Sequence, residues 1–213
     1  VNNFTSKKLG LTYEDVAAVL NKTLAYEQSG GLGVDDVYIN DKVPFGYDYA
    51  DNDPDVYSTH NNHGTHVSGV IVGKDDTITG VAPNAQLISM KAFSDVMDTA
   101  RASWILSALE DCVILGVDVI NMSLGMSCGF SREEDANKTN EVYDKVYAAG
   151  SNLVVAAGNE SSSGMGGAYG STNLTSNPDS ATVGSPSTYP GALSVASISG
   201  TKSKYIVAND QQI

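Results

Sequence analysis

Stretches with helical spacing of apolar residues alternate along the chain with short, continuously apolar runs. Helical spacing is present in three stretches: 12–26, 100–115 and 133–149. Continuous apolar runs occupy four shorter stretches: 87–92, 117–122, 153–157 and 193–197. Helices of this length between strands are typical of parallel strands joined by right-handed crossovers. The pattern therefore predicts an α/β fold built on a parallel sheet.

The first third of the chain combines a helix signal with polar, irregular segments. Thr12 is the expected N-cap of the first helix, with Asp15 three residues later. Residues 28–33 contain three glycines and predict a flexible, exposed loop. Such loops are preferred sites of proteolysis, so cleavage by the protein itself near Gln28-Ser29 is one hypothesis. Residues 35–62 are polar, aromatic and acid-rich, which predicts a solvated loop.

The composition is that of a folded globular domain, and the charge restricts the kinds of partner that the chain can bind. The chain has 213 residues, of which 41% are hydrophobic and 17% are charged. Its formal net charge of −13 argues against nucleic-acid partners and is compatible with attraction of basic substrates. No apolar run approaches the roughly 18 residues of a membrane span. Cys112 and Cys128 lack metal-type spacing, and we interpret them as core thiols or one optional bridge.

Residues 62–73 place a histidine at the start of a segment of small and apolar residues. Apolar residues recur at helical spacing from position 67 to 71, and Gly64 and Gly69 leave room for close backbone approach. We therefore expect a buried helix whose first turn points His63 into a cleft. A histidine fixed there can transfer protons.

Two polar segments directly follow predicted strands, where ligands bind in open α/β sheets. They are Ser123-Leu124-Gly125 and Gly158-Asn159. The Asn159 amide can donate to an oxyanion that develops during acyl transfer. The small residues of the other segment suit an edge on which an extended peptide pairs through its backbone. The structural alternatives are that Asn159 is an ordinary turn residue and that segment 123–125 is an ordinary exit from a strand. The Gly/Pro-rich loop 183–191 either forms the wall of a specificity pocket or is a tight connection.

Five motifs occur in an order that resembles the core of the subtilisin-like serine proteases, the subtilases. They are His-Gly-Thr-His-Val-x-Gly from residue 63, Gly-Val-Ala-Pro from 80, Asn-Met-Ser-Leu-Gly from 121, Ala-Ala-Gly-Asn from 156 and Val-Gly-x-Pro from 183, followed by Tyr-Pro. The resemblance covers about residues 62–197. It implies a subtilisin-like doubly wound parallel sheet with helices on both faces, present here as an incomplete catalytic domain.

The same resemblance implies roles for individual residues. His63 would be the general base and Asn159 the oxyanion donor. Backbone partners of the substrate would be Ser123, Leu124 and Gly125. The S1 pocket would be lined by Ala156, Ala157, Gly158 and Gly184. Residues 34–202 would form the partial catalytic domain, preceded by an N-terminal helix with a flexible Gly-rich loop in 1–33 and followed in 203–213 by a linker or protease-associated insert.

The segment 39–51 is similar to the cell-envelope proteinases of lactic bacteria and streptococci, such as lactocepin and C5a peptidase. It reads Ile-Asn-Asp-Lys-Val-Pro-Phe-Gly-Tyr-Asp-Tyr-Ala-Asp and most resembles the streptococcal envelope proteases that cleave chemokines. This implies a secreted enzyme, anchored in the bacterial cell wall, that trims basic CXC chemokines. The chemistry requires no cofactor. A structural calcium ion remains an alternative, although Asp51, Asp53 and Asp55 lack the glycine and glutamate of a calcium loop.

A complete triad also needs a carboxylate and a serine. The Asp-Ser/Thr-Gly motif of the family is not found; Asp36 is the nearest candidate, but no hydrophobic strand precedes it. Residues 200–203, Gly-Thr-Lys-Ser, do not match Gly-Thr-Ser-x-Ala. We therefore expect both residues to lie in other segments of a longer protease, and this chain alone to have no peptidase activity.

Two other functions are compatible with the sequence. His60, His63 and His66 are spaced by three, which suggests a zinc hydrolase, although the third residue turns away from the face of the first and no acidic ligand is fixed. A degenerate subtilase domain that binds peptides without cleaving them is the second alternative.

Overall fold

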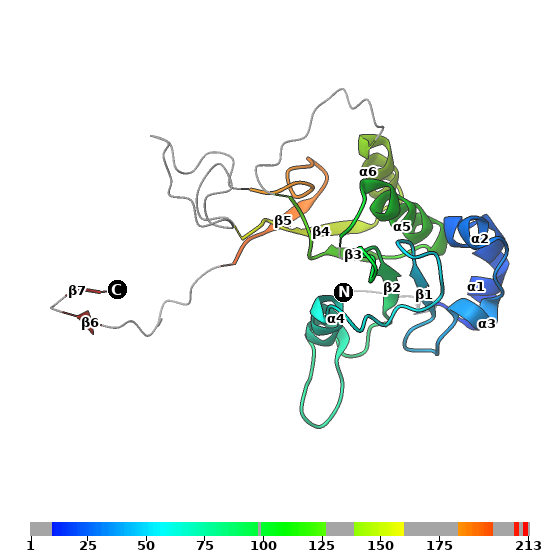
Figure 1. Cartoon of the computed structure of the whole chain (residues 1–213), viewed down its shortest axis with the longest axis horizontal. Coiled ribbons are helices and arrows are strands. Elements are labelled where there is room, and N and C mark those ends of the chain that lie inside the picture. The colour runs from blue at the N-terminus through cyan, green and yellow to red at the C-terminus, as the bar shows by residue number, and fades with distance from the viewer. Residues whose placement is uncertain are drawn as a thin grey trace, which may run out of the picture. The chain divides into compact units, whose positions relative to one another are not determined.

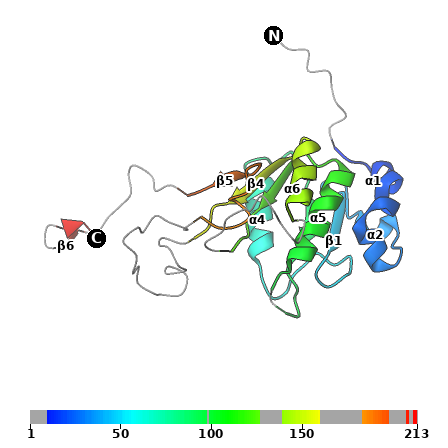
Figure 2. The same cartoon turned by 90° about the horizontal axis from the view of Figure 1, so that it is seen from above.

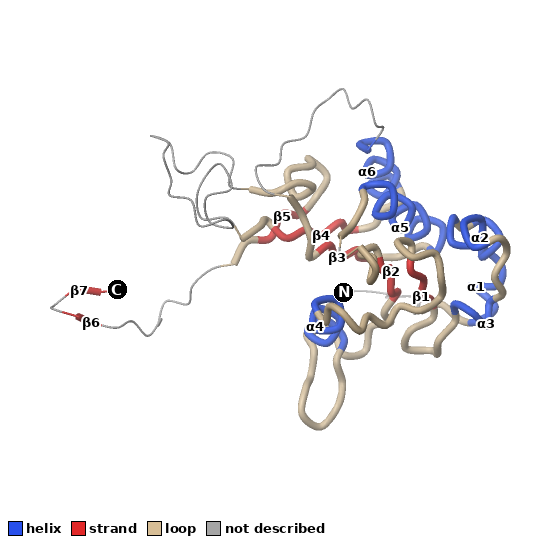
Figure 3. The backbone as a smooth tube through the Cα atoms, in the orientation of Figure 1, coloured by secondary structure: helices blue, strands red, loops and turns tan. Residues whose placement is uncertain are grey.

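A computed structural model describes residues 10–97, 99–126, 139–159 and 183–197. It also gives the backbone of two short strands, β6 (Val207–Ala208) and β7 (Gln211–Gln212), which pair antiparallel (Figure 3). The chain divides into two compact units, which we describe separately: Val1–Ser123 with Arg132–Leu153, and Leu124–Ser131 with Val154–Ile213. None of the helices in the described ranges has the length and apolar character needed to cross a membrane.

The first unit begins with a group of short helices instead of one continuous helix over 12–26. They are α1 (Tyr13–Val19), the 3-10 helix η1 (Leu20–Lys22), α2 (Leu24–Ser29) and α3 (Val34–Val37). The predicted cap at Thr12 is confirmed, because its side chain and that of Asp15 form a capping box. The helix breaks at Thr23, whose backbone is extended. The Thr23 hydroxyl then caps α2 by accepting the N–H of Tyr26 at 3.1 Å.

The glycine-rich loop starts later than predicted. Gln28 and Ser29 belong to the last turn of α2, which ends at Gly30 in the left-handed conformation (φ 80°). The hydroxyl of Ser29 donates to the Tyr26 carbonyl at 3.0 Å, and the Gln28 side chain donates to the Ser107 hydroxyl at 3.1 Å. The predicted cleavage hypothesis therefore concerns a helical peptide bond.

The prediction of a solvated loop over 35–62 is wrong for its first part. This part contains β1 (Phe45–Asp48), whose four residues are all buried. β1 pairs parallel with β2 (Ile88–Lys91), with Phe45 opposite Ile88 and Asp48 opposite Lys91. The aromatic residues at positions 45, 47 and 49 share one face because side chains alternate along an extended chain. The segment from β1 to α4 (His63–Val72) is loop (Figure 3).

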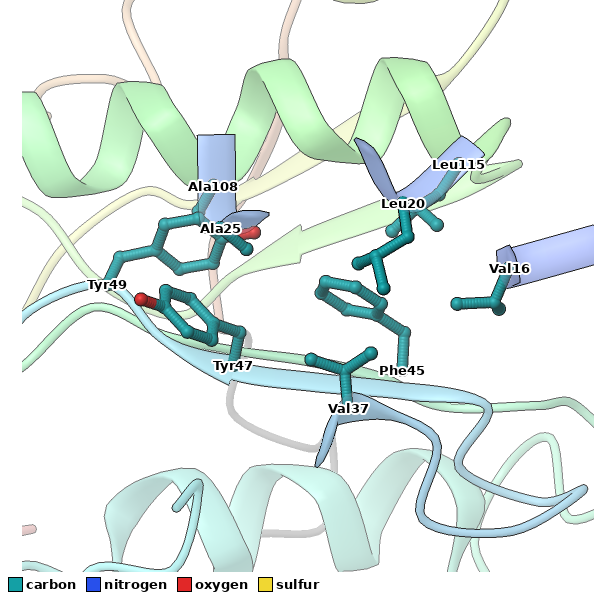
Figure 4. Packing of buried hydrophobic residues seen from close by; sticks show 9 residues of the cluster. All are labelled: Val16, Leu20, Ala25, Val37, Phe45, Tyr47, Tyr49, Ala108 and Leu115. Atoms are coloured by element: carbon teal, nitrogen blue, oxygen red, sulfur yellow. The ribbon is translucent and has the colours of Figure 1, made fainter. Parts of the chain in front are cut away.

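The main core of the first unit lies between β1 and the helices above it (Figure 4). Its buried members are Val16, Leu20, Ala25, Val37, Phe45, Tyr47, Tyr49, Ala108 and Leu115. The rings of Tyr47 and Tyr49 meet edge to face with centroids 5.0 Å apart. Helices α1 and α2 therefore share this core with β1 and with α5 (Ala102–Leu115). The predicted boundary after residue 33 remains a prediction.

A buried carboxylate joins three of these elements. Asp111 of α5 is fully buried and accepts the backbone N–H groups of Leu24 at 2.7 Å and Ala25 at 2.9 Å. It also accepts the hydroxyl of Tyr49 at 2.8 Å. Negative charge at the first turn of a helix stabilises the unpaired N–H groups there. Asp111 therefore fastens the start of α2 to α5 and to the end of β1.

The remaining elements confirm the α/β prediction. The strands predicted at 87–92, 117–122, 153–157 and 193–197 correspond to β2, β3 (Val119–Met122), β4 (Asn152–Ala156) and β5 (Leu193–Val195). β4 pairs parallel with β5, and the sheet order is β3-β4-β5. Of the helix predicted over 133–149, α6 covers Thr139–Ala148, whereas residues 133–138 lie outside the described residues. α5 and α6 run side by side (Figure 2), and α4 lies across β1 and β2 from α5 (Figure 1).

Helix α4 is not the buried helix that the sequence predicts. Among its residues only Val72 is buried, and Val70 is 51% exposed. A Cβ atom at Gly64 or Gly69 would meet no atom within 4 Å. Close approach occurs instead after the helix, where a Cβ at Gly80 would lie 2.7 Å from the carbonyl oxygen of Ile71. Gly64 and Gly69 therefore do not make the close backbone approach that was predicted for them.

Candidate active site

His63 is the first residue of α4, and its side chain is exposed. The preceding Asn62 is the N-cap but makes no side-chain capping bond. The side-chain oxygen of Asn61 takes this role and accepts the backbone N–H of His63 at 2.9 Å. The Asn61 side chain therefore holds the start of α4, and His63 projects from this position to the surface. A proton-transfer group needs such a fixed and accessible position.

The imidazole of His63 contacts one of the predicted substrate-binding residues. Its Nε2 lies 3.0 Å from the backbone carbonyl oxygen of Ser123, the residue after β3. A carbonyl oxygen only accepts, so Nε2 is the donor and carries a proton. In a neutral ring with this hydrogen bond, Nδ1 is the unprotonated nitrogen. The structure thus brings His63 and Ser123 together, with Nε2 committed to the backbone.

A cluster of charged residues lies where β1 and β2 end. Asp48 and Lys91, the last residues of the two strands, face each other in register, and the Lys91 ammonium donates to the Asp48 carboxylate. Its Nζ also lies 3.5 Å from Oδ2 of Asp51 and 3.5 Å from Oδ2 of Asp95. One cation therefore binds three carboxylates at the carboxyl edge of the strands, the edge at which α/β proteins place their ligands.

The electrostatics of this cluster favour the charged lysine. Burial disfavours the ammonium of Lys91, but the hydrogen bond and charge of Asp48, with the charges of Asp95 and Asp51, outweigh it and raise its pKa. Partial burial acts against the charged form of Asp51, but the Ser94 hydroxyl, the Asp95 N–H and Lys91 together lower its pKa. Lys91 consequently serves as an internal counter-ion that holds two loops.

The acid-rich segment is organised by its own side chains. Oδ1 of Asp53 accepts the N–H of Asp55 at 2.8 Å, and Oδ1 of Asp55 accepts the N–H of Tyr57 at 2.9 Å. Within the described ranges, no group of three or more His, Cys, Asp or Glu side chains is arranged to hold a metal ion. The zinc interpretation of the three histidines thus has no site among these residues, and the calcium alternative remains a prediction.

In the second unit, three predicted site segments form one backbone cluster. The N–H of Gly184 donates to the Ala157 carbonyl at 2.8 Å, and Met126 and Ser185 exchange two backbone hydrogen bonds of 2.8 Å. A Cβ atom at Gly125 would lie 2.9 Å from the Ser185 carbonyl oxygen, and one at Gly184 would lie 2.9 Å from that of Met126. Glycine is therefore required at both positions by the close approach of two chain segments.

Asn159 follows this cluster at the exit of β4. Ala156 is the last residue of the strand and is half-buried, and Ala157 donates its N–H to the Val195 carbonyl at 2.8 Å. Gly158 then adopts a positive φ of 117°, a conformation that glycine adopts readily. Asn159 itself is exposed. Asn159 belongs to the second unit and His63 to the first, so their convergence on one substrate remains a prediction.

Of the two weak triad candidates, Asp36 lies within the described residues, where its carboxylate has a capping role. The Asp36 carboxylate accepts the N–H of Gly33 at 2.7 Å and thereby caps the short helix α3. Residues 200–203 lie outside the described residues. The sequence did not reveal the cluster of Lys91 with its three carboxylates. Asp48 and Lys91 are 43 positions apart, and only the pairing of β1 with β2 brings them together.

Comparison with known proteins identifies close similarities in sequence and fold. A model described as the subtilase family matches residues 18–210. The PI-type proteinase of Lactococcus lactis subsp. cremoris is 37% identical over 174 residues, which cover 77% of this chain and 9% of that protein. Subtilisin E of Bacillus subtilis (strain 168) is 32% identical over 174 residues, which cover 81% of this chain and 40% of that protein.

Solved structures agree on the fold. A mutant of the protease domain of PatA superposes with a TM-score of 0.50 at 22% identity, over 66% of this chain and 44% of that one. The chain thus spans less than half of each of these relatives, and only 9% of the lactococcal proteinase.

Proposed function

Because the chain belongs to the subtilase family of serine proteases, we propose that it is the part of an endopeptidase that supplies the catalytic histidine and the oxyanion asparagine. The observation that carries this proposal is the position of His63: an exposed imidazole at the first residue of α4, in contact with the backbone of Ser123. The family match includes both His63 and Asn159. A serine and an aspartate from other segments of a longer protein would complete the triad.

In the proposed reaction, Nε2 of His63 takes the proton of the serine hydroxyl while the serine oxygen attacks the peptide carbonyl carbon. The π electrons of the carbonyl move onto its oxygen, and the Asn159 amide stabilises that oxyanion by donating a hydrogen bond. The tetrahedral intermediate then collapses: its oxyanion re-forms the carbonyl, the C–N bond breaks, and His63 gives its proton to the leaving amine. Water hydrolyses the resulting acyl-serine through the same proton transfers in reverse. Because Nε2 donates to Ser123 in the structure, the ring must leave this carbonyl and carry its proton on Nδ1, the nitrogen that the triad aspartate would bind, before Nε2 can accept a proton.

The substrate part of the proposal is a basic protein at the bacterial surface. The similarity to the lactococcal proteinase supports a protease at the cell surface. The resemblance of segment 39–51 to the streptococcal envelope proteases is what suggests CXC chemokines as substrates. The net charge of −13 supports basic substrates, because opposite charge accelerates encounter at low salt. Ser123, Leu124 and Gly125 would pair with the substrate backbone, and Ala156, Ala157, Gly158 and Gly184 would surround the substrate side chain.

The test uses the complete protein with a serine-directed fluorophosphonate and a basic CXC chemokine. His63→Ala should abolish cleavage and labelling. Asn159→Ala should lower kcat by roughly 100- to 1,000-fold, the loss known from the equivalent donor in subtilisin. The matched control is His66→Ala, an exposed histidine one turn along the same helix, which should keep full activity. Cleavage by the His63→Ala protein would refute the proposal, and chemokine binding without turnover by the unmodified protein would favour the degenerate binding module.

A further inference from the structure

We propose that Ser58 and Asp95 are positioning residues for His63, because they join the loop that ends at the histidine to the charged cluster at the ends of β1 and β2. The inference rests on the proposed function, since positioning matters to the reaction only if His63 is the general base. It concerns residues that neither the sequence motifs nor the family match single out.

The first link is the side chain of Ser58. Its hydroxyl donates to Oδ1 of Asp95 at 2.5 Å, across 37 positions of sequence. The same oxygen accepts the backbone N–H groups of His60 at 3.3 Å and Asn61 at 3.0 Å. Ser58 is half-buried, whereas its neighbours Tyr57 and Thr59 are exposed. One hydroxyl therefore shapes the turn before α4 and ties that turn to the segment after β2.

The second link reaches the histidine itself. Asn61, whose N–H is held by Ser58, accepts the N–H of His63 through its side-chain oxygen at 2.9 Å. This N–H belongs to the first turn of α4 and has no partner within the helix. Asn62 supplies no side-chain cap. The orientation in which α4 begins, and with it the direction of the imidazole, thus depends on the turn that Ser58 holds.

The third link fixes Asp95, the partner of Ser58, to the charged cluster. The backbone N–H of Asp95 donates to Oδ2 of Asp51 at 2.8 Å, and its carboxylate lies 3.5 Å from the Lys91 ammonium. The Lys91 side chain is 10% exposed and that of Asp48 is 2% exposed. The anchor is therefore buried at the ends of two paired strands, which are among the rigid parts of a fold.

Displacement of a catalytic group by about 1 Å can lower a rate by roughly 100-fold. In the complete protease, Ser58→Ala should therefore lower kcat by about 10- to 100-fold with little change in KM. Ser58→Thr keeps the hydroxyl and should restore most of the rate. Asp95→Ala should also lower kcat, and the double variant should lose less than the two single losses combined, because both changes remove the Ser58–Asp95 hydrogen bond.

The matched control is Ser107→Ala, which removes another half-buried hydroxyl, one that accepts a hydrogen bond from Gln28 in the same unit. It should keep wild-type kcat. Wild-type kcat in Ser58→Ala, an equal loss in Ser107→Ala, or additive losses in the double variant would overturn the inference. These outcomes differ from failure of the proposed function, in which His63→Ala itself retains activity.

Discussion

Nε2 of His63 donates a hydrogen bond of 3.0 Å to the carbonyl oxygen of Ser123. The first residue of α4 is thus hydrogen-bonded to the residue that follows β3. The family resemblance assigns these two residues to different tasks, proton transfer and substrate pairing. The contact means that the imidazole meets the first residue of the predicted substrate edge within the first unit. It also fixes which ring nitrogen carries the proton, and this has a direct spectroscopic consequence.

We expect the neutral His63 ring in the 213-residue chain to be protonated at Nε2. The reason is that the Ser123 carbonyl can only accept a hydrogen bond. The measurement is the ¹⁵N chemical shift of both ring nitrogens above the titration range, with assignment by a His63→Gln variant. His66, exposed on the next turn, is the internal reference. Protonation of His63 at Nδ1 would show that the contact with Ser123 is absent in solution.

Removal of the Asp111 carboxylate should strongly destabilise the first unit. Asp111→Ala leaves the N–H groups of Leu24 and Ala25 and the hydroxyl of Tyr49 without their acceptor. We expect the free energy of unfolding in urea to fall by about 3 kcal/mol or more, since each buried unpaired donor costs about 1–3 kcal/mol. Asp111→Asn, which keeps one acceptor oxygen, should lose less.

The control for this prediction is Glu110→Ala on the same helix. Glu110 pairs with Lys145 at 2.7 Å on the surface, and such pairs contribute at most about 1 kcal/mol. Equal losses for the Asp111→Ala and Glu110→Ala proteins would show that the buried contacts of Asp111 contribute little to stability.

Cys112 should be unreactive in the folded chain. It is a free cysteine, buried in α5, and burial, with a further contribution from the charge of Asp111, raises the pKa of its thiol to about 12. The thiolate is the reactive form, so at pH 8 the folded protein presents very little of it. In a Cys128→Ser variant we expect slow modification by iodoacetamide in buffer and fast modification in urea. Rapid reaction of the folded variant would contradict this burial.

Gly184→Ala should destabilise the second unit, because a Cβ there would lie 2.9 Å from the Met126 carbonyl oxygen, a backbone atom. Overpacking of this kind typically costs about 1–3 kcal/mol in unfolding free energy. The matched control is Gly69→Ala in α4, where the Cβ meets no atom within 4 Å and helix propensity improves. A neutral Gly184→Ala would show that the paired segments 125–126 and 184–185 can separate without loss.

The sequence alone predicts the elements that are long or uniformly apolar. The strands after Gly116 and Gly150 and the helix α5 follow from periodicity and capping, which are local properties. β1 was missed because its buried run includes Gly46 and ends in the carboxylate of Asp48, and the burial of that carboxylate is stable only beside Lys91. Pairing with a residue 43 positions away leaves no local signal.

The candidate site was predicted unevenly for the same reason. The motifs locate His63, but they do not contain its contact with Ser123 or the link through Ser58 and Asp95, which arise when separate loops fold together. The expected burial of α4 failed because the apolar spacing of a helix shows which residues can be buried, whereas their neighbours decide whether they are.

The end of α2 has a consequence for any attempt to cut the chain between Gln28 and Ser29. Proteases act on extended peptides, so this bond becomes a substrate only in molecules whose last helical turn has opened. When opening is fast, the cutting rate reports the fraction of open molecules. Cutting at this position, followed over time in proteins with and without the Asp111 carboxylate, would then measure how far this carboxylate lowers the fraction of molecules in which the end of α2 is open.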